Sequence, residues 1–230
     1  MDVLVLVESW HHSFADVAVH RAAQSGFHFL DRPSYDDPVA TESGCGIIVY
    51  HCDHLKAKRV ELKRVPTTFE ALAVSLASDR GPTMLLVLHR PGSSHSTTTF
   101  YDELLAFLDQ FALYNTQLVL AGDLNLHLED SLLPETVEFV AILERFGLKQ
   151  HVTESTRVSG GLLGVVTRDD CQVSNVTVFP LPSQIMDQSS PQFLLGVNLF
   201  SSPCVGFVIG RSLPSSLEEA CPNSLPCGST

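Results

Sequence analysis

Residues 118–127 read Leu-Val-Leu-Ala-Gly-Asp-Leu-Asn-Leu-His, an apolar run that ends at a glycine and continues with alternating polar side chains. The apolar run predicts a strand that is buried on both faces. Asp123 and Asn125 lie two residues apart beyond it, so on extended chain their side chains share a face. A carboxylate there can orient or deprotonate a water, and an amide can hold a phosphoryl oxygen while charge develops. An Asx turn after the strand explains the same two residues equally well.

Two further predicted strands also end at polar side chains. Glu8 follows the apolar run Val3–Val7, and His89 follows the apolar run at 83–88. An acid at the end of a buried strand is a suitable ligand for Mg²⁺, which takes one or two carboxylates and keeps several waters. The same acid can instead mark the point where the strand reaches solvent. His89 can donate to a phosphate, or it can be a structural or surface histidine.

The remaining pattern predicts an α/β protein of the α+β kind, with more strands than helices. Further apolar strands are predicted at 46–50, 60–65, 70–76, 163–167 and 173–179, and helices with one apolar face at 100–111 and 134–146. Because several strands follow one another directly, we expect antiparallel or mixed pairing. Prolines and serines interrupt the pattern after about residue 180, so we expect one domain over residues 1–195 and a divergent, disordered tail over residues 196–230.

Composition narrows the classes of function. The chain has 230 residues, of which 44% are hydrophobic, and this suits one ordinary globular domain. Its 14 basic and 26 acidic side chains give a net charge of −12, so binding to nucleic acid needs a local basic patch or bound cations. The one basic cluster, at 56–64, is more simply the exposed face of a strand.

The sequence also carries signals about compartment and metal binding. No run approaches the roughly 18 apolar residues of a membrane span, and Val3–Val7 lacks the basic flank and the length of a signal peptide. We therefore expect an intracellular protein, nuclear or cytoplasmic, with reduced cysteines. The six cysteines form no CxxC pair and no zinc-type spacing with histidines, which argues against a zinc site.

Five stretches carry a resemblance to a known family. They are residues 7–10 (Val-Glu-Ser-Trp), 44–49 (Gly-Cys-Gly-Ile-Ile-Val), 88–91 (Leu-His-Arg-Pro), 122–127 (Gly-Asp-Leu-Asn-Leu-His) and 146–152 (Phe-Gly-Leu-Lys-Gln-His-Val). Together they resemble the endonuclease/exonuclease/phosphatase superfamily, and more narrowly the endonuclease domain of LINE-type, non-LTR retrotransposons. The resemblance covers roughly residues 2–190, and the last two stretches at this spacing are its specific part.

The resemblance implies a four-layer sandwich of two mixed β-sheets flanked by helices. It also implies Mg²⁺-dependent phosphodiester hydrolysis, with DNA as the substrate, in a retrotransposon-derived protein associated with reverse transcriptase. Carried over residue by residue, it makes Glu8 a metal ligand, Asp123 the residue that orients or activates the water, and Asn125 a contact of the scissile phosphate. His89 occupies the place of a phosphate-contacting tyrosine.

The later part of the chain matches the family less well. Thr156 matches a threonine near the substrate, and Asp187 matches the aspartate of a closing Ser-Asp-His stretch, which makes it a catalytic residue by resemblance. Gln188 stands where that stretch has its histidine, and Gly164 stands where the family's Thr-Leu-Asp-Leu-Val-Ile-Thr stretch has its aspartate. A neutral amide cannot neutralise charge on phosphate as an imidazolium does. The family's first strand, which carries an asparagine ahead of Glu8, and its closing strands are expected to be missing.

We therefore expect a retrotransposon-derived, endonuclease-like domain whose activity is weakened. One alternative is a catalytically inactive pseudoenzyme or interaction module with the same fold. A second alternative is a phosphoesterase that acts on small molecules, which the acidic net charge favours over a nuclease acting on DNA. The sequence leaves the oligomeric state open, and we expect no membrane partner.

Overall fold

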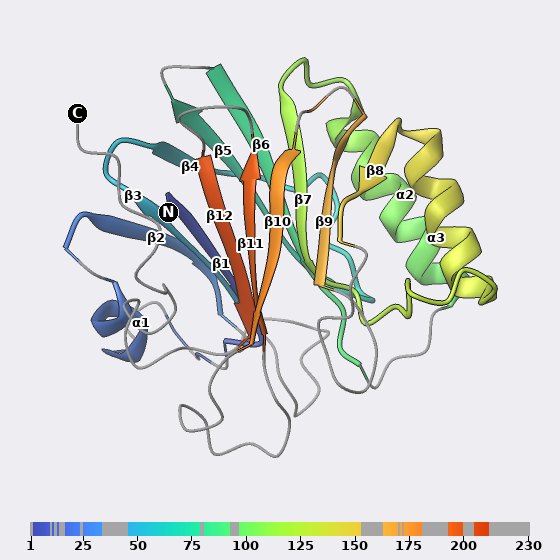
Figure 1. Ribbon diagram of the computed structural model, residues 1–230, viewed down its shortest axis with the longest axis horizontal. Helices are drawn as coiled ribbons and strands as arrows, with labels where there is room; N and C mark the ends of the chain where they lie inside the picture. The colour runs from blue at the N-terminus through green and yellow to red at the C-terminus, as the bar shows by residue number, and fades with distance from the viewer. Residues whose placement is uncertain are drawn as a thin grey trace.

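Two six-stranded β-sheets packed face to face make up the body of the molecule (Figure 1). The computed structural model describes residues 2–9, 11, 13, 17–23, 25–33, 46–78, 81–92, 97–152, 163–169, 171, 173–180, 193–199 and 205–211. Helices α2 (Thr98–Ala112) and α3 (Pro134–Arg145) cover the outer face of one sheet, and the short helix α1 (Val17–Ala22) lies against the other. This arrangement confirms the expected four-layer sandwich.

Both sheets are mixed, as the sequence predicted. The first has the order β10 (Val173–Pro180), β11 (Phe193–Leu199), β12 (Val205–Arg211), β1 (Val3–Val7), β3 (Ile47–Cys52) and β2 (Phe27–Arg32). The second has the order β4 (Lys56–Val60), β5 (Glu70–Ser78), β6 (Gly81–His89), β7 (Gln117–Asp123), β9 (Leu163–Arg168) and β8 (Leu148–Gln150). The pairs β1–β12 and β6–β7 are parallel, and the other described pairs are antiparallel.

The alternation of side chains along the strands builds two separate cores. Val3, Val5 and Val7 of β1 face the space between the sheets, where they pack with side chains of β6 and β7 such as Val87 and Val119. A second core fills the space between the other face of the β5–β6–β7 region and the two long helices; it includes Phe69, Leu86, Phe100, Phe107, Leu120 and Phe139. Central strands are therefore buried on both faces, which explains their continuous apolar sequences.

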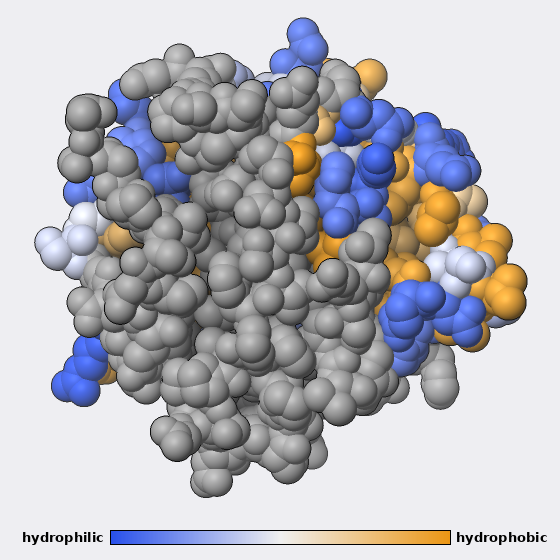
Figure 2. Space-filling model, in the orientation of Figure 1, coloured by the Kyte–Doolittle hydropathy of each residue, from blue (hydrophilic) through white to orange (hydrophobic). Residues whose placement is uncertain are grey.

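Local sequence signals explain where the two long helices begin. Thr97 caps α2, because its side-chain oxygen accepts a hydrogen bond from the backbone N–H of Phe100 (3.3 Å). Helix α3 begins at Pro134, whose fixed φ suits the first turn. Figure 2 shows apolar surface over α3, where Val137 and Val140 are exposed. No helix in the part of the chain that the structure describes is long and apolar enough to cross a membrane.

The end of the chain corrects the expected domain boundary. Strand β12 forms within residues 196–230, which we expected to be a disordered tail, and it pairs in parallel with β1 from Val3↔Phe207 to Val7↔Arg211. Strand β11 pairs with β12, so closing strands are present although the sequence predicted that they were missing. As a result β1 lies between β3 and β12 and is not an edge strand. Residues 212–230 lie outside the described residues.

Candidate active site

Three strands bring the predicted polar side chains to one end of the sandwich. Glu8 directly follows β1, and its Oε1 lies 3.3 Å from Nε2 of His89, the last residue of β6. His89 is in turn the register partner of Asp123, the last residue of β7. Asn125 follows two residues later. The structure therefore places Glu8, His89, Asp123 and Asn125 together, although they come from three separate segments.

His89 lies between two carboxylates inside the protein. Its Nδ1 donates to Glu70 Oε2 (2.8 Å) and its Nε2 to Glu8 Oε1 (3.3 Å), and neither His89 nor Glu70 is exposed to solvent. Burial alone lowers the pKa of His89, but the hydrogen bonds and charges of Glu70 and Glu8 outweigh it and raise the pKa to about 9. The ring is therefore an imidazolium at neutral pH. It holds Glu8 in place and does not face the solvent as a free phosphate ligand would.

Asp123 and Asn125 form a compact turn fixed by a buried arginine. The backbone N–H of Asn125 donates to Asp123 Oδ1 (2.9 Å), which is the Asx geometry that the sequence allowed. Arg90 donates through Nε to the Leu124 carbonyl (2.6 Å) and through Nη2 to the Asn125 carbonyl (2.8 Å), and its guanidinium lies over the Phe100 ring. Burial lowers the pKa of Arg90. Arg90 thus fixes the backbone that presents Asp123 and Asn125.

The backbone is strained at two of these residues. Among the residues that the structure describes, Glu8 (φ 53°) and Asn125 (φ 50°) are the only non-glycine residues with positive φ. Asparagine tolerates the left-handed region, whereas for glutamate it is costly, on the order of 1–3 kcal/mol. Such strain persists where the surrounding structure enforces it, and it gathers at functional sites. Both strained residues were predicted site residues.

A buried polar chain supports the Glu8 turn from behind. Ser9 Oγ lies 2.6 Å from His11 Nδ1, and His11 Nε2 donates to Asp31 Oδ2 at 3.0 Å. All three side chains are buried, so this Ser–His–Asp series has no access to a substrate and acts as a support. The Ser9 backbone N–H also donates to the Gly46 carbonyl (3.2 Å), and the Gly46 N–H donates to both oxygens of Glu70. Gly46 therefore links the segment that carries Glu8 to the side chain of Glu70.

The structure describes only part of the predicted set. Thr156, Asp187 and Gln188 lie outside the described residues. Gly164 is the register partner of Gly122, and both line a small apolar cavity beneath α3. Leu163 is the register partner of Asp123. Gly164 shares the helix-covered face with Val166, and its assignment to the family's aspartate position stays a prediction.

Sequence reasoning missed two residues that matter here, Glu70 and Arg90. The sequence predicts Glu70 only as the start of a strand, whereas the register of β5 against β6 makes it the partner of His89. An acid placed at the first position of an otherwise apolar strand was the available signal, since a buried acid needs a partner. Arg90 follows His89 directly, and its buried position, 3% exposed, was not visible in the sequence.

The donor set at this end fits a hard divalent cation. Glu8 keeps 21% of its side chain exposed, and carboxylate and amide oxygens are ligands that Mg²⁺ accepts while it keeps several waters. The carboxylates of Glu8 and Glu70 face a single imidazolium, so the cluster retains an excess of negative charge that attracts a cation. Glu8 is the residue that would hold the metal.

The two facing mixed sheets agree with the sandwich that the resemblance implied, and solved structures of endonuclease/exonuclease/phosphatase proteins share this fold. No protein-family model and no curated protein matches the sequence. The similar solved structures include the 3′ phosphatase NExo from Neisseria, bound to a product DNA hairpin (15% identity, TM-score 0.60, covering 87% of this chain and 89% of that chain). An endonuclease/exonuclease/phosphatase family protein from Leptotrichia buccalis is 11% identical (TM-score 0.60, 87% of each chain).

A retrotransposon protein is also among these similar structures. The endonuclease domain of TRAS1, a telomere-specific non-LTR retrotransposon, is 10% identical to this chain, with a TM-score of 0.54. The match covers 85% of this chain and 97% of that domain. At such identities the likeness establishes the fold, and the chemistry has to be argued from the site.

Proposed function

We propose that this protein is a Mg²⁺-dependent phosphodiester hydrolase of the endonuclease type, derived from a retrotransposon and weakened in activity. The observation that carries the proposal is that Glu8 contacts His89, the register partner of Asp123, at one end of the sandwich. Glu8 and Asn125 are both held in left-handed backbone. The shared fold with structures named as a DNA 3′ phosphatase and a retrotransposon endonuclease supports it.

Each residue has a role that follows from its chemistry. Asp123 is buried at the end of β7, so it would orient and deprotonate a water that is enclosed with the substrate, as a positioned carboxylate does in general base catalysis. Asn125 Nδ2 donates one N–H to the Arg90 carbonyl, and its second N–H contacts a phosphoryl oxygen as charge develops on it. Glu8 holds Mg²⁺, which when bound neutralises charge on the phosphate. His89 is a positioning residue, because both ring nitrogens are used by Glu70 and Glu8.

The proposed weakness rests on Gln188, which replaces the family's histidine. Loss of one such electrophilic group typically costs about 10²–10³-fold in rate. A slow enzyme is therefore expected, and a pseudoenzyme is the limiting case. The acidic net charge keeps a phosphoesterase that acts on small molecules as the second candidate.

Nicking of supercoiled plasmid in Mg²⁺ tests the proposal. We expect slow, EDTA-sensitive nicking that falls at least about 100-fold in Asp123→Asn and in Glu8→Gln. Glu138→Gln is the matched control, since Glu138 is an exposed acid on α3 far from the strand ends in sequence. Nicking that survives in Asp123→Asn contradicts the assigned roles. No nicking in any protein favours the pseudoenzyme, and release of phosphate from a small phosphomonoester such as p-nitrophenyl phosphate without nicking favours the phosphoesterase.

A further inference from the structure

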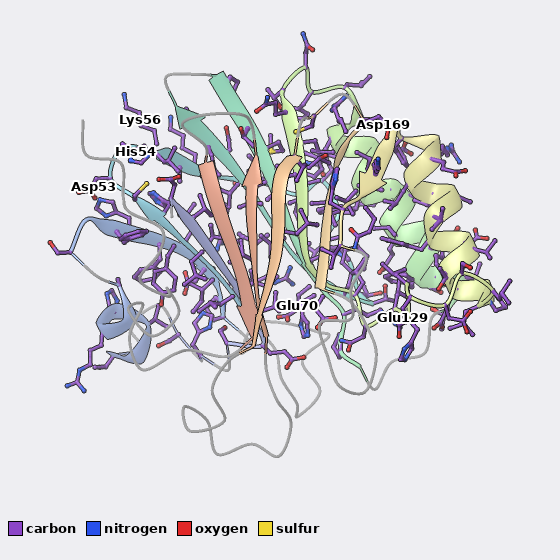
Figure 3. The ribbon with its side chains drawn as sticks, in the orientation of Figure 1. Asp53, His54, Lys56, Glu70, Glu129 and Asp169 are labelled. Atoms are coloured by element: carbon purple, nitrogen blue, oxygen red, sulfur yellow. The ribbon has the colours of Figure 1, made fainter. Side chains whose placement is uncertain are left out.

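A second group of ligand-type side chains lies at the other end of β1. Asp2 precedes β1 just as Glu8 follows it, and its backbone carbonyl accepts a hydrogen bond from the N–H of Cys52 at the end of β3 (2.9 Å). Two residues further on, His54 lies in the turn that leads to β4. Figure 3 shows His54 at the end of the sandwich opposite Glu70. This group is therefore separate from the candidate active site.

The donor atoms of Asp2, Cys52 and His54 are close to one another. Cys52 Sγ lies 3.2 Å from His54 Nδ1, 3.5 Å from His54 Nε2 and 3.8 Å from Asp2 Oδ1. His54 Nε2 lies 3.5 Å from Asp2 Oδ1. One thiol sulfur, one imidazole nitrogen and one carboxylate oxygen thus form a triangle with sides of 3.5, 3.5 and 3.8 Å.

These distances match the ligand spacing around a tetrahedral metal. Zinc bonds of about 2.0–2.3 Å at tetrahedral angles separate the ligand atoms by about 3.3–3.6 Å. A cation can therefore sit above the triangle after small side-chain adjustments. Sulfur and imidazole donors select Zn²⁺ and similar transition metals, whereas Mg²⁺ requires an all-oxygen set.

We propose that Asp2, Cys52 and His54 form a binding site for a Zn²⁺-class transition-metal ion. The three side chains leave a fourth coordination position for water, and His54, which is 60% exposed, gives the site access to solvent. Cys52 is 4% exposed and so supplies an enclosed sulfur. The proposal does not depend on the proposed hydrolase function.

Such a site would join two strands that are distant in sequence. The metal would link residue 2 to residues 52 and 54, and so fasten the start of β1 to the turn after β3. Because β1 carries Glu8 at its far end, a stabilised β1 also steadies the candidate active site. The cysteine spacing gave no sign of this site, since Asp2 comes from another strand and Cys-x-His alone is not a zinc signature.

Cobalt binding to the full, EDTA-treated chain tests the proposal. We expect one Co²⁺ per chain, with a thiolate-to-metal charge-transfer band and the intense visible bands of tetrahedral Co²⁺, displaced by stoichiometric Zn²⁺ but not by millimolar Mg²⁺. Cys52→Ser abolishes the charge-transfer band. His54→Ala, at a position where the side chain is 60% exposed, weakens Co²⁺ binding at least about tenfold.

Two matched controls separate this site from other ligands. His28 pairs with Asp53 (3.0 Å) on the same rim without a thiol, so His28→Gln keeps the wild-type spectrum and affinity. Cys171→Ser keeps the charge-transfer band, because Cys171 is the other described cysteine and lies in another segment. The absence of the band in the wild-type protein overturns the proposal, and so does a band that persists in Cys52→Ser or an affinity that is unchanged in His54→Ala.

Discussion

At the scale of single residues, the charge of His89 couples stability to pH. The pKa of His89 is raised from 6.5 to about 9 in the folded protein, by Glu70 and Glu8 acting against burial. A group whose pKa is raised on folding adds stability that is fully present below about pH 6.5 and is lost as pH rises through 9. The shift corresponds to roughly 3 kcal/mol. In metal-free protein we expect the melting temperature to fall by roughly 5–10 °C between pH 6.5 and 9.5.

Thermal melts of His89→Gln provide the comparison. This variant removes the imidazolium, so it leaves Glu8 and Glu70 near each other without a cation between them. It should be less stable than the wild type at pH 6.5 and should lose less stability on going to pH 9.5. Parallel pH profiles for the two proteins would show that His89 is not the titrating group.

At the scale of elements, Gly122 determines how closely β6 and β7 approach. A Cβ on Gly122 (φ +132°) would lie 1.9 Å from the backbone carbonyl oxygen of Leu88, and backbone cannot move aside as a flexible side chain can. We expect Gly122→Ala to lower the melting temperature by more than about 6 °C, or to prevent folding, since overpacking costs about 1–3 kcal/mol and sometimes more.

Gly81→Ala is the matched control for backbone strain. Gly81 has a similar positive φ (+118°), but no atom lies within 4 Å of its added Cβ. We therefore expect Gly81→Ala to lower the free energy of unfolding only through the unfavourable positive φ of alanine, by about 1–2 kcal/mol. Equal losses of stability in Gly81→Ala and Gly122→Ala would mean that the contact with Leu88 is not what requires glycine in β7.

The long, continuous apolar strands were the elements that the sequence predicted best. Val3–Val7 has the predicted bounds, and β7 extends the predicted run by two residues to Asp123. Strand β2 (Phe27–Arg32) was missed because Asp31 and Arg32 resemble loop residues, whereas tertiary contacts satisfy them: Asp31 binds His11 and Arg32 donates to the Ala71 carbonyl. Tertiary partners of this kind are not visible in local sequence.

Strand β12 shows a second limit of local patterns. Its sequence, Val-Gly-Phe-Val-Ile-Gly-Arg, contains strong strand formers. Two glycines and the neighbouring prolines lower its strand propensity, so the sequence pattern did not predict a strand here. What stabilises it is parallel pairing with β1, about 200 residues earlier in the chain. For the same reason, local sequence could not identify Glu70 as the partner of His89: only the register of β5 against β6 brings the two residues together.

At the scale of the whole molecule, the charges are arranged against tight DNA binding. The net charge is −12, and Figure 3 shows Lys56, the first residue of the basic cluster, at the end of the molecule opposite Glu70. Lys63 and Arg64 share a cavity of about 470 Å³ with acidic side chains of α2, namely Asp102, Glu103 and Asp109. Within the part of the chain that the structure describes, the basic cluster is thus either distant from the candidate site or balanced by acids.

This arrangement predicts weak duplex DNA binding with a shallow dependence on salt. A protein that contacts Z phosphates through Lys and Arg loses affinity with a slope of about −0.9Z in a plot of log K against log salt. With few available basic side chains we expect fewer than about three such contacts, and hence a slope shallower than about −3. Fluorescence anisotropy with Ca²⁺ in place of Mg²⁺, between low and moderate salt, measures it for a labelled duplex. If DNA lies at the Glu8 end, Lys56→Gln should leave the affinity unchanged. A steep salt dependence whose slope falls by about one in Lys56→Gln would contradict this prediction. It would place the DNA on β4, away from the proposed catalytic residues.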